Sequence, residues 1–401
     1  MKLTAIVSEY NPFHNGHKYL IEKARENGAT HIIAIMGGNF LQRGECAIMD
    51  KYARAEAAVK GGVDLVLELP SIYAVASAEI FARGAVETLD KCRCVDNLCF
   101  GSEGGGISML MSAAELTESP GLLKVCKRYI KLGYSHPRAM QAAAEELGST
   151  KASECLARLL NQPNNTLGIE YIRALRDLES SITPVAIDRI GVKHNSDFTL
   201  DEFASASKIR EMILTDDKAF YNYIPSETRK IIEEQIGELL CPASFANGGA
   251  VLSILRRMNV EELKRLPDVT EGLENRLYRA IKESTGVEEI IKRVKCKRYT
   301  YARLSRIIVC AYLGIDKEMS KLPPQYIRPL AFNDKGTEIL RQMKKESDLP
   351  VIMSLRRDKE KLSGVGKAML EKDILASDMY RLLTPKIHPC SSDYYNGAIR
   401  M

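Results

Sequence analysis

The chain contains 401 residues, of which 45% are hydrophobic and 27% are charged, and its formal net charge is +5. This length suits two or three packed domains, and ten cysteines are sparse for it, so a short peptide, a disordered tail and a disulfide-rich mini-domain are excluded. No apolar run approaches the roughly 18 residues of a membrane-spanning helix, and the first residues lack a secretory signal pattern, so we expect a cytoplasmic protein with no membrane segment and with reduced thiols.

The first part of the chain alternates short apolar runs with Ala-rich segments of helical spacing. Such alternation at intervals of about 30 residues predicts a parallel sheet with right-handed crossovers, which is a Rossmann-like α/β domain. Ligands on such sheets bind beyond the carboxyl ends of the strands, so the loops after the strands are expected to line a site. The predicted strands are 3–7, 31–36, 63–69 and 97–100, and the predicted helices between them are 18–26, 50–60 and 76–89.

The α/β pattern continues with helices and one more strand. Residues 108–176 are predicted to be helical, a fifth strand is expected at 183–189, and a further helix begins near Ser205. We therefore assign residues 1–237 to the α/β domain. A segment rich in small residues at 241–249 is the predicted linker.

The segment 250–401 is predicted to form a second domain, mainly α-helical and without strands, and it carries most of the positive charge. Residues 1–240 hold 27 Lys and Arg against 32 Asp and Glu, whereas residues 241–401 hold 30 against 20. Clustered Lys and Arg attract phosphates through counterion release, so this asymmetry favours a polyanionic partner for the second domain. A well-solvated helical domain is the alternative that charge alone leaves open.

The sharpest motif follows the first predicted strand, where His14 and His17 flank Asn15 and Gly16. A helix beginning at about His17 would point its free amides at a ligand, and Gly16 would let that ligand approach the backbone closely. Two imidazoles there can donate to nucleotide phosphates and stabilise charge on a departing pyrophosphate. A surface turn and a metal site are the alternatives, although a zinc site would need further Cys or His ligands at short spacing, which this stretch lacks.

The His-x-Gly-His motif after the first strand resembles the nucleotidyltransferase superfamily that includes the class I aminoacyl-tRNA synthetases. Longer strings resemble, over nearly the whole chain, the bacterial tRNA(Met) cytidine acetate ligases. The resemblance implies that acetate and ATP form acetyl-adenylate, and that the acetyl group passes to the wobble cytidine of elongator tRNA(Met) to give N(4)-acetylcytidine. The strings are EYNPFHNGH at 9–17, GGNFLQRG at 37–44, ELP at 68–70, FGSE at 100–103 and PNNTLGIEY at 163–171.

A second phosphate-binding element is identified by resemblance at 204–210. Ser205 is a natural N-cap, and the free amides of its helix, with Ser207 and Lys208, would form an anion site opposite the two histidines. An ordinary capped helix is the alternative interpretation. The expected catalytic residues are therefore His14, His17, Ser205, Ser207 and Lys208.

The resemblance also implies which residues contact ATP. Most of them lie in the turn and helix after the first strand. For the last three, the alternatives are a turn at Gly101, helix capping by Asn164 and a rim salt bridge by Arg189. A Mg²⁺ ion is expected because ATP chemistry of this type uses a divalent cation, yet no acidic pair in the sequence identifies its ligands. The expected set is Val7, Ser8, Glu9, Tyr10, Asn11, Phe13, His14, Gly16, His17, Tyr19, Leu20, Gly101, Asn164 and Arg189.

The loop after the second strand is the expected position of the acetate carboxylate, because Asn39, Gln42 and Arg43 lie there. The acetate oxygen would attack the α phosphorus in line. In such a reaction the protein supplies position and charge stabilisation more than acid or base catalysis.

The basic half contains one dense cluster, in which cations alternate with tyrosines before and within a predicted helix from Thr300. This composition suits phosphate contacts and stacking on the unpaired bases of an anticodon loop. Helical spacing predicts that Leu304 and Ile308 are buried and that Arg303 and Arg306 point outward. A solvated charged face is the alternative. The predicted RNA contacts are Lys295, Lys297, Arg298, Tyr299 and Arg303.

Three hypotheses follow from the sequence. The first is an ATP-dependent acetate:tRNA ligase. The second is a nucleotidyltransferase that acts on a phosphorylated small molecule, which leaves the basic half unexplained. The third is an RNA-binding protein with a vestigial nucleotide site, which the intact residues His14, His17, Ser205 and Lys208 disfavour. The oligomeric state does not follow from the sequence.

Overall fold

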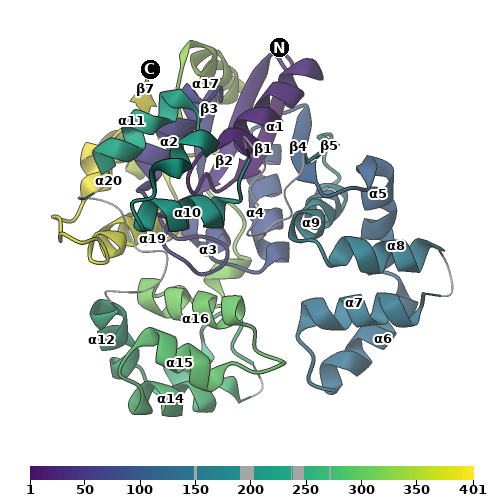
Figure 1. Cartoon of the computed structure of the whole chain (residues 1–401). Helices are drawn as coiled ribbons and strands as arrows, with labels where there is room; N and C mark the ends of the chain where they lie inside the picture. Colours follow the sequence, from purple (N-terminus) through teal and green to yellow (C-terminus); the bar gives the residue numbers. More distant parts are fainter. Residues whose placement is uncertain (149–150, 190–202, 236, 238–247, 271) are drawn as a thin grey trace.

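The computed structural model describes residues 1–148, 151–189, 203–235, 237, 248–270 and 272–401. One sheet in the order β5-β4-β1-β2-β3-β6-β7 organises the chain (Figure 1). The five strands from β5 to β3 run parallel, β6 is antiparallel to β3, and β7 is parallel to β6. The strands are β1 (Leu3–Ser8), β2 (His31–Gly37), β3 (Leu65–Leu69), β4 (Asn97–Ser102), β5 (Thr183–Asp188), β6 (Pro329–Phe332) and β7 (Ile399–Arg400).

The sheet is covered on both faces, which is why its central strands are continuous apolar runs. All residues of β2 are buried; Ile33 and Ile35 join one core, whereas Ile32 and Ala34 join the other. The first core contains residues of α4 (Ala78–Lys91), α5 (Gly106–Thr117) and α9 (Pro163–Asp177). The second contains residues of α1 (Asn15–Glu26), α2 (Lys51–Lys60), α10 (Ala206–Leu214) and α11 (Ser226–Gln235). The five strands and the helices between them that the sequence predicted are confirmed.

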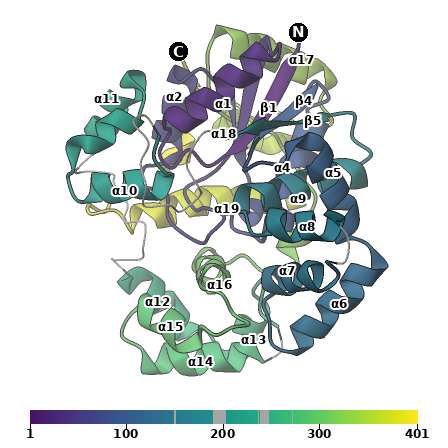
Figure 2. The same ribbon diagram turned by 45° about the vertical axis from the view of Figure 1, so that its right-hand side comes forward.

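Two helical groups lie below the sheet in the view of Figure 2. One group projects from the α/β part and comprises α6 (Pro120–Lys131), α7 (His136–Glu146) and α8 (Lys151–Leu160). The other comprises α12 (Gly249–Arg257), α13 (Val260–Lys264), α14 (Leu273–Glu283), α15 (Val287–Val294) and α16 (Tyr301–Leu313). The predicted linker at 241–249 lies outside the described residues up to residue 247. None of the described helices is long and apolar enough to cross a membrane.

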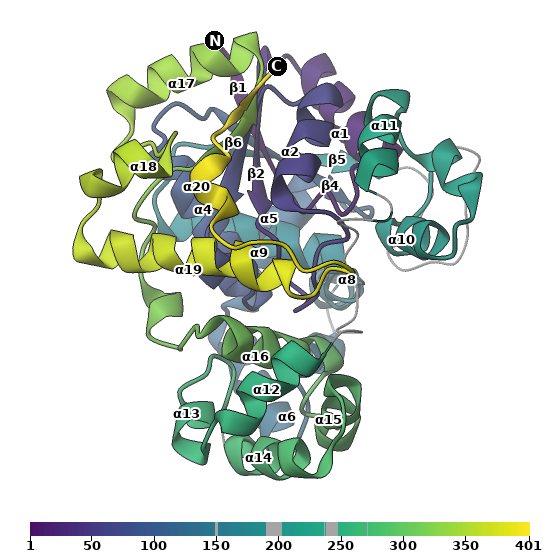
Figure 3. The ribbon, with the colours of Figure 1, turned by 90° about the vertical axis from the view of Figure 1, so that its left-hand side faces the viewer.

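The prediction that residues 250–401 contain no strand is wrong. β6 pairs with β3, and β7 extends the sheet at its edge. The chain around them forms α17 (Asp334–Glu346), α18 (Leu355–Asp358), α19 (Gly364–Arg381) and α20 (Ser392–Tyr395), which Figure 3 shows gathered on one side of the molecule. The basic second half is therefore two structural parts, one helical and one built onto the sheet. The assignment of ATP and tRNA binding to separate domains stays a prediction.

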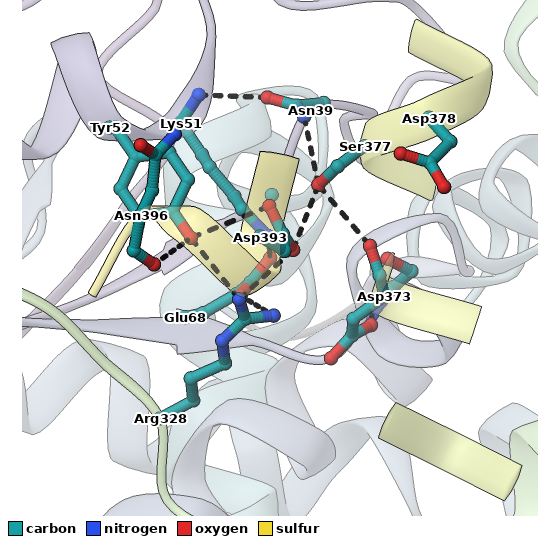
Figure 4. A network of polar contacts seen from close by, with 12 residues as sticks. Asn39, Lys51, Tyr52, Glu68, Arg328, Asp373, Ser377, Asp378, Asp393 and Asn396 are labelled. Atoms are coloured by element: carbon teal, nitrogen blue, oxygen red, sulfur yellow. Dashed lines mark hydrogen bonds and ion pairs between the residues drawn. The ribbon is translucent and has the colours of Figure 1, made fainter. Parts of the chain in front are cut away.

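The C-terminal part is joined to the sheet by a buried ionic cluster (Figure 4) of Lys51, Glu68, Arg328, Asp373 and Asp393. The Lys51 Nζ lies 2.7 Å from both Glu68 Oε1 and Asp393 Oδ2, and Arg328 Nη2 lies 2.9 Å from Asp393 Oδ2. Although burial alone would raise it, the two cations lower the pKa of Asp393 to about 2. Burial and the nearby Glu68 charge raise the pKa of Asp373 to about 6. Lys51 and Arg328 are paired with Glu68 and Asp393, whereas Asp373 accepts hydrogen bonds from Ser71 N and Tyr326 Oη, and these partners offset the cost of burying the charges.

Candidate active site

A cavity of about 510 Å³ opens beyond the carboxyl ends of β1, β4 and β5. Its lining includes every residue of the predicted ATP set except Phe13. Phe13 is fully buried below the turn, against Gly61 at the end of α2, so its predicted contact with ATP is wrong. A β-carbon at Gly61 would lie 2.3 Å from the Phe13 ring. The strand-end position expected from the topology is confirmed.

The histidine pair is built into the start of α1. The helix begins at Asn15, two residues before the predicted start, with His14 as its N-cap. Gly16 N donates to His14 Nδ1 at 3.1 Å, and His14 N donates to His17 Nδ1 at 3.2 Å. The two imidazoles thus form a capping box, in the places usually held by Ser or Thr and by Glu. Because both Nδ1 atoms accept hydrogen bonds, a neutral ring carries its proton on Nε2, which is left to donate to a ligand.

The two rings are neutral in the free protein. They stack with centroids 3.7 Å apart and 26° between their planes. Burial, together with the charges of Arg189 and Arg210, lowers the pKa of His14 to about 3. Burial and the neighbouring ring of His14 lower the pKa of His17 well below its ordinary value. The pair is therefore a hydrogen-bond donor that gains charge only when an anion compensates it.

Gly16 has a role that the sequence did not reveal. A β-carbon at this position would lie 2.9 Å from His14 Cε1, so a side chain would push the imidazole away from the helix start. The expected reason was close approach of a ligand to the backbone. The structure adds a second reason, which is that glycine leaves room for the capping ring, while the ligand approach stays a prediction.

A second helix N-terminus lines the same cavity. Ser205 is the N-cap of α10, with its Oγ accepting from Lys208 N at 3.2 Å, and Ser207 Oγ lies 3.1 Å from Ser205 Oγ. Ser205 and Ser207 line the cavity, and their catalytic role stays a prediction. The Lys208 side chain is not among the residues that line the cavity and lies 3.1 Å from Glu211, and its place in the anion site stays a prediction.

Arg210, one turn along α10, is the cation that lines the cavity there. Its Nη1 donates to Asn11 O at 2.9 Å, and its Nη2 lies 3.6 Å from Glu45 Oε2. It belongs to the element identified by resemblance at 204–210, but helical spacing alone does not tell which basic side chain turns inward. Arg210 therefore brings positive charge beside the histidine pair.

The far side of the cavity is formed by the ends of β4 and β5 and the start of α9. Gly101, Asn164 and Arg189 line it, and their contact with ATP stays a prediction. A β-carbon at Gly101 would lie 3.1 Å from Arg189 Cγ, so the absence of a side chain at Gly101 leaves room for the Arg189 side chain to lie across β4. The neighbouring Asn165 is wholly buried and accepts from Ser102 Oγ and Glu103 N, which fixes the strand end to α9.

The loop after β2 divides into cavity and core residues. Gln42 and Arg43 line the cavity, together with Leu41 and Glu45. Asn39 does not: it is buried, accepts from Lys51 N at 2.7 Å and donates to Ser377 Oγ at 3.4 Å (Figure 4), so its predicted role toward acetate is wrong.

Arg54 is a site-positioning residue that sequence reasoning missed. It is fully buried and its guanidinium donates to the carbonyl oxygens of Glu9, Gly37 and Gly38. It therefore ties the end of β1 to the end of β2. Glu9 in turn accepts from Gln42 N at 2.8 Å, and burial raises its pKa. Nothing in an Ala-rich helical segment indicates such a role, because it depends on which strand ends meet in the fold.

The predicted RNA-binding residues lie at the junction of α15, α16 and the α6–α7 group. Lys295 and Lys297 are exposed, whereas Tyr299 is buried. Arg303 donates to the carbonyl oxygen of Asp268, between α13 and α14. Arg306, predicted to point outward, is only 13% exposed and pairs with Asp268 at 3.1 Å, so that prediction is wrong. The predicted burial of Leu304 and Ile308 is confirmed.

The described residues contain no group of three or more His, Cys, Asp or Glu side chains that could hold a metal ion. Within the cavity, the Glu9 carboxylate accepts a backbone amide and Glu45 faces Arg210. This donor set does not fit a dedicated protein cage for Mg²⁺, which in nucleotide sites is held largely through phosphates and water.

Stacked donor imidazoles on the first crossover of a Rossmann-like sheet, beside a second capped helix, define a nucleotidyl transferase. A family model described as HIGH Nucleotidyl Transferase matches residues 1–393. The chain is 40% identical to the tRNA(Met) cytidine acetate ligase of Thermoanaerobacter sp. (strain X514), over 100% of both chains. It is 39% identical to that of Clostridium kluyveri (strain NBRC 12016), over 100% of this chain and 99% of the relative.

Solved structures agree with these relatives. Thermotoga maritima TmcAL bound with alpha-thio ATP matches with a TM-score of 0.91 at 32% identity, over 100% of both chains. The apo form of the same protein matches with a TM-score of 0.92 at 33% identity. This chain therefore belongs to the tRNA(Met) cytidine acetate ligase family, which confirms the resemblance inferred from its motifs.

Proposed function

We propose that this chain joins acetate to ATP, releasing pyrophosphate, and then transfers the acetyl group of acetyl-adenylate to the wobble cytidine of elongator tRNA(Met). The observation that carries the proposal is the orientation of the two imidazoles. Both Nδ1 atoms accept hydrogen bonds from backbone N–H groups, so both Nε2–H groups can donate to phosphate oxygens. The same cavity is lined by Arg189 and Arg210.

In the first step, an acetate oxygen attacks the α phosphorus and the bond to the β phosphate breaks. Negative charge grows on the departing pyrophosphate. The imidazole N–H groups and the positive dipole ends of α1 and α10 stabilise that charge without reorganising, since they are held in place before the substrate arrives. Ser205 and Ser207 add hydroxyl donors at the start of α10.

Acetate itself is expected beside Gln42 and Arg43, which share the cavity with the histidine pair. Arg54 holds the strand ends that support this loop, so the carboxylate meets a preformed surface. A bound Mg²⁺ would neutralise phosphate charge and would be held largely by the phosphates and water, since the described residues offer no protein cage for it.

In the second step, the exocyclic amine of the cytidine attacks the acyl carbon, AMP leaves, and the amine loses a proton. The amine is a poor nucleophile because its lone pair is delocalised into the ring, which is why the acyl group must be activated first. The chain's part in this step is to hold the adenylate in the cavity and to bind RNA at its mouth.

The function is tested by incubating the protein with ATP, labelled acetate and bulk tRNA, followed by digestion of the RNA. The proposal predicts acetate-dependent release of pyrophosphate and labelled N(4)-acetylcytidine. Pyrophosphate release that needs a phosphorylated small molecule instead of acetate would establish the alternative transferase. Absence of acetate-dependent release, with tRNA still bound, would overturn the proposal.

A further inference from the structure

A short stretch within the acidic half of the chain has the opposite charge. Residues 119–144 contain five Lys and Arg and no Asp or Glu, although residues 1–240 as a whole carry five more acidic than basic residues. The nucleotide site uses one residue of this stretch, Pro137 at the start of α7, which lines the cavity. Neither the ATP site nor the core accounts for the five cations.

The structure places four of these cations on α6 and the fifth, Arg138, on α7. The apolar face of α6 buries Leu122 and Cys126, and its other face exposes Lys124, Lys127 and Lys131 at helical spacing. In the part of the chain that the structure describes, none of these three lysines forms an ion pair. By contrast, the other two cations are neutralised: Arg128 pairs with Glu146, and Arg138 lies 3.5 Å from Glu145. The three lysines form a stripe, about 10 Å long, which we call the α6 stripe.

The stripe ends where the basic cluster of the second half begins. Lys297 Nζ lies 3.6 Å from the centroid of the Tyr134 ring, and Arg298 Nη2 donates to Ile130 O at 3.0 Å. The loop between α15 and α16 is thereby seated on the C-terminal end of α6. These two contacts bring Lys297 next to the C-terminal end of α6, so two basic segments far apart in sequence are neighbours in the fold. Pro137 connects this region to the rim of the cavity.

We propose that the α6 stripe is a second RNA-binding element, which holds the phosphate backbone of the substrate RNA next to the cavity. The inference rests on the proposed function and adds a binding surface in the first half of the chain to the basic cluster in the second. Three exposed ammonium groups in a row suit phosphates, since they carry charge without base-reading geometry. Contacts from both surfaces fix where the RNA lies relative to Pro137 and the cavity.

The test compares Lys124→Ala/Lys127→Ala/Lys131→Ala with a matched control, Arg341→Ala/Lys344→Ala/Lys345→Ala. The control removes three exposed cations from α17, which lies at the opposite end of the molecule in Figure 1. RNA affinity is measured at several salt concentrations, and acetate-dependent ATP–pyrophosphate exchange is measured in the absence of RNA. The charge-preserving variant Lys124→Arg/Lys127→Arg/Lys131→Arg reports whether charge alone matters.

The proposal predicts that the α6 variant loses affinity on the order of 10- to 100-fold and that its salt slope falls by about 2 to 3. Pyrophosphate exchange stays at the wild-type rate, and the arginine variant and the α17 control bind RNA normally. Equal affinity and slope for the α6 variant and the control would overturn the inference while leaving the proposed function intact. A wild-type protein that exchanges pyrophosphate but binds no tRNA would overturn the RNA part of both proposals.

Discussion

At the scale of single residues, His14 and His17 serve local structure and chemistry at once. Their Nδ1 atoms satisfy backbone amides that the first turn of a helix leaves free, and this same bonding fixes which nitrogen faces the cavity. The motif indicated phosphate binding from the sequence. It did not indicate the capping, because histidine is not among the preferred N-cap residues.

His17→Ala should slow adenylate formation on the order of 10²-fold, because it removes one preorganised donor to the departing pyrophosphate. RNA affinity should not change. Acetate-dependent ATP–pyrophosphate exchange and tRNA binding measure the two effects. His31→Ala is the control, since His31 pairs with Glu338 away from the cavity. Equal loss of exchange and RNA affinity in His17→Ala would contradict the separate roles.

His14 also makes stability depend on pH. An unfolded histidine takes up a proton below a pH of about 6.5, whereas burial and the charges of Arg189 and Arg210 hold the folded pKa near 3. The unfolded state therefore binds more protons as the pH falls below about 6.5, and stability is lost at about 1.4 kcal/mol per pH unit. His14→Asn keeps a capping side chain without the titration.

Urea unfolding at pH 7 and pH 5 measures this effect. Between the two pH values, the unfolding free energy of His14→Asn should fall by about 2 kcal/mol less than that of the wild type. Identical pH dependence of the two proteins would show that the imidazole is not held neutral.

At the scale of elements, the loop after β2 joins the cavity to the helical group of the second half. It carries Gln42 and Arg43 on one side and contacts α16 on the other. Gly44 has a φ of 73°, and a β-carbon there would lie 2.4 Å from the backbone of Ser305 and Arg306. Glycine is required for both the backbone angle and the close approach.

Gly44→Ala should therefore lower the free energy of unfolding by more than the backbone strain of an alanine in the left-handed region. Gly104→Ala is the matched control, since Gly104 has a φ of 80° and nothing within 4 Å of a β-carbon. Both carry the left-handed penalty of about 1–2 kcal/mol, and only Gly44→Ala adds overpacking of about 1–3 kcal/mol. Urea unfolding gives the difference. Equal destabilisation by Gly44→Ala and Gly104→Ala would mean that α16 shifts to accommodate the added methyl group at no cost in stability.

The elements also show how far sequence patterns reach. Continuous apolar runs identified the parallel strands, because a strand covered on both faces has no polar alternation. The four residues of β6 carry too short a signal, and their strand character depends on pairing with β3. The roles of Arg54 and Arg210 could not be predicted for the same reason, because their partners are carbonyl and carboxylate groups that only the fold brings near them.

At the scale of the whole molecule, the C-terminal end of the chain completes the α/β part. Asp393 lies on α20 and forms buried ion pairs with Lys51 and Arg328. The sequence does not indicate this pairing, since its pattern predicts a separate helical domain for the end of the chain. Charges far apart in sequence neutralise each other only after the chain folds back onto β3.

Asp393→Asn should destabilise the protein by about 3–5 kcal/mol, because it leaves the buried Lys51 and Arg328 with Glu68 as their single ion-pair partner. The control is Asp334→Asn, which weakens an exposed pair with Arg400 at 3.4 Å and should change little. Urea unfolding at neutral pH compares the two. A loss in Asp393→Asn no larger than that of the control would show that the C-terminal segment does not depend on the buried ionic cluster.

A crystal structure of this protein with a non-hydrolysable ATP analogue tests the central claim most directly. Phosphate oxygens are expected within hydrogen-bond distance of the Nε2 atoms of His14 and His17, between the starts of α1 and α10. A triphosphate bound in the cavity with both Nε2 atoms turned away from it, or bound elsewhere on the molecule, would contradict the account.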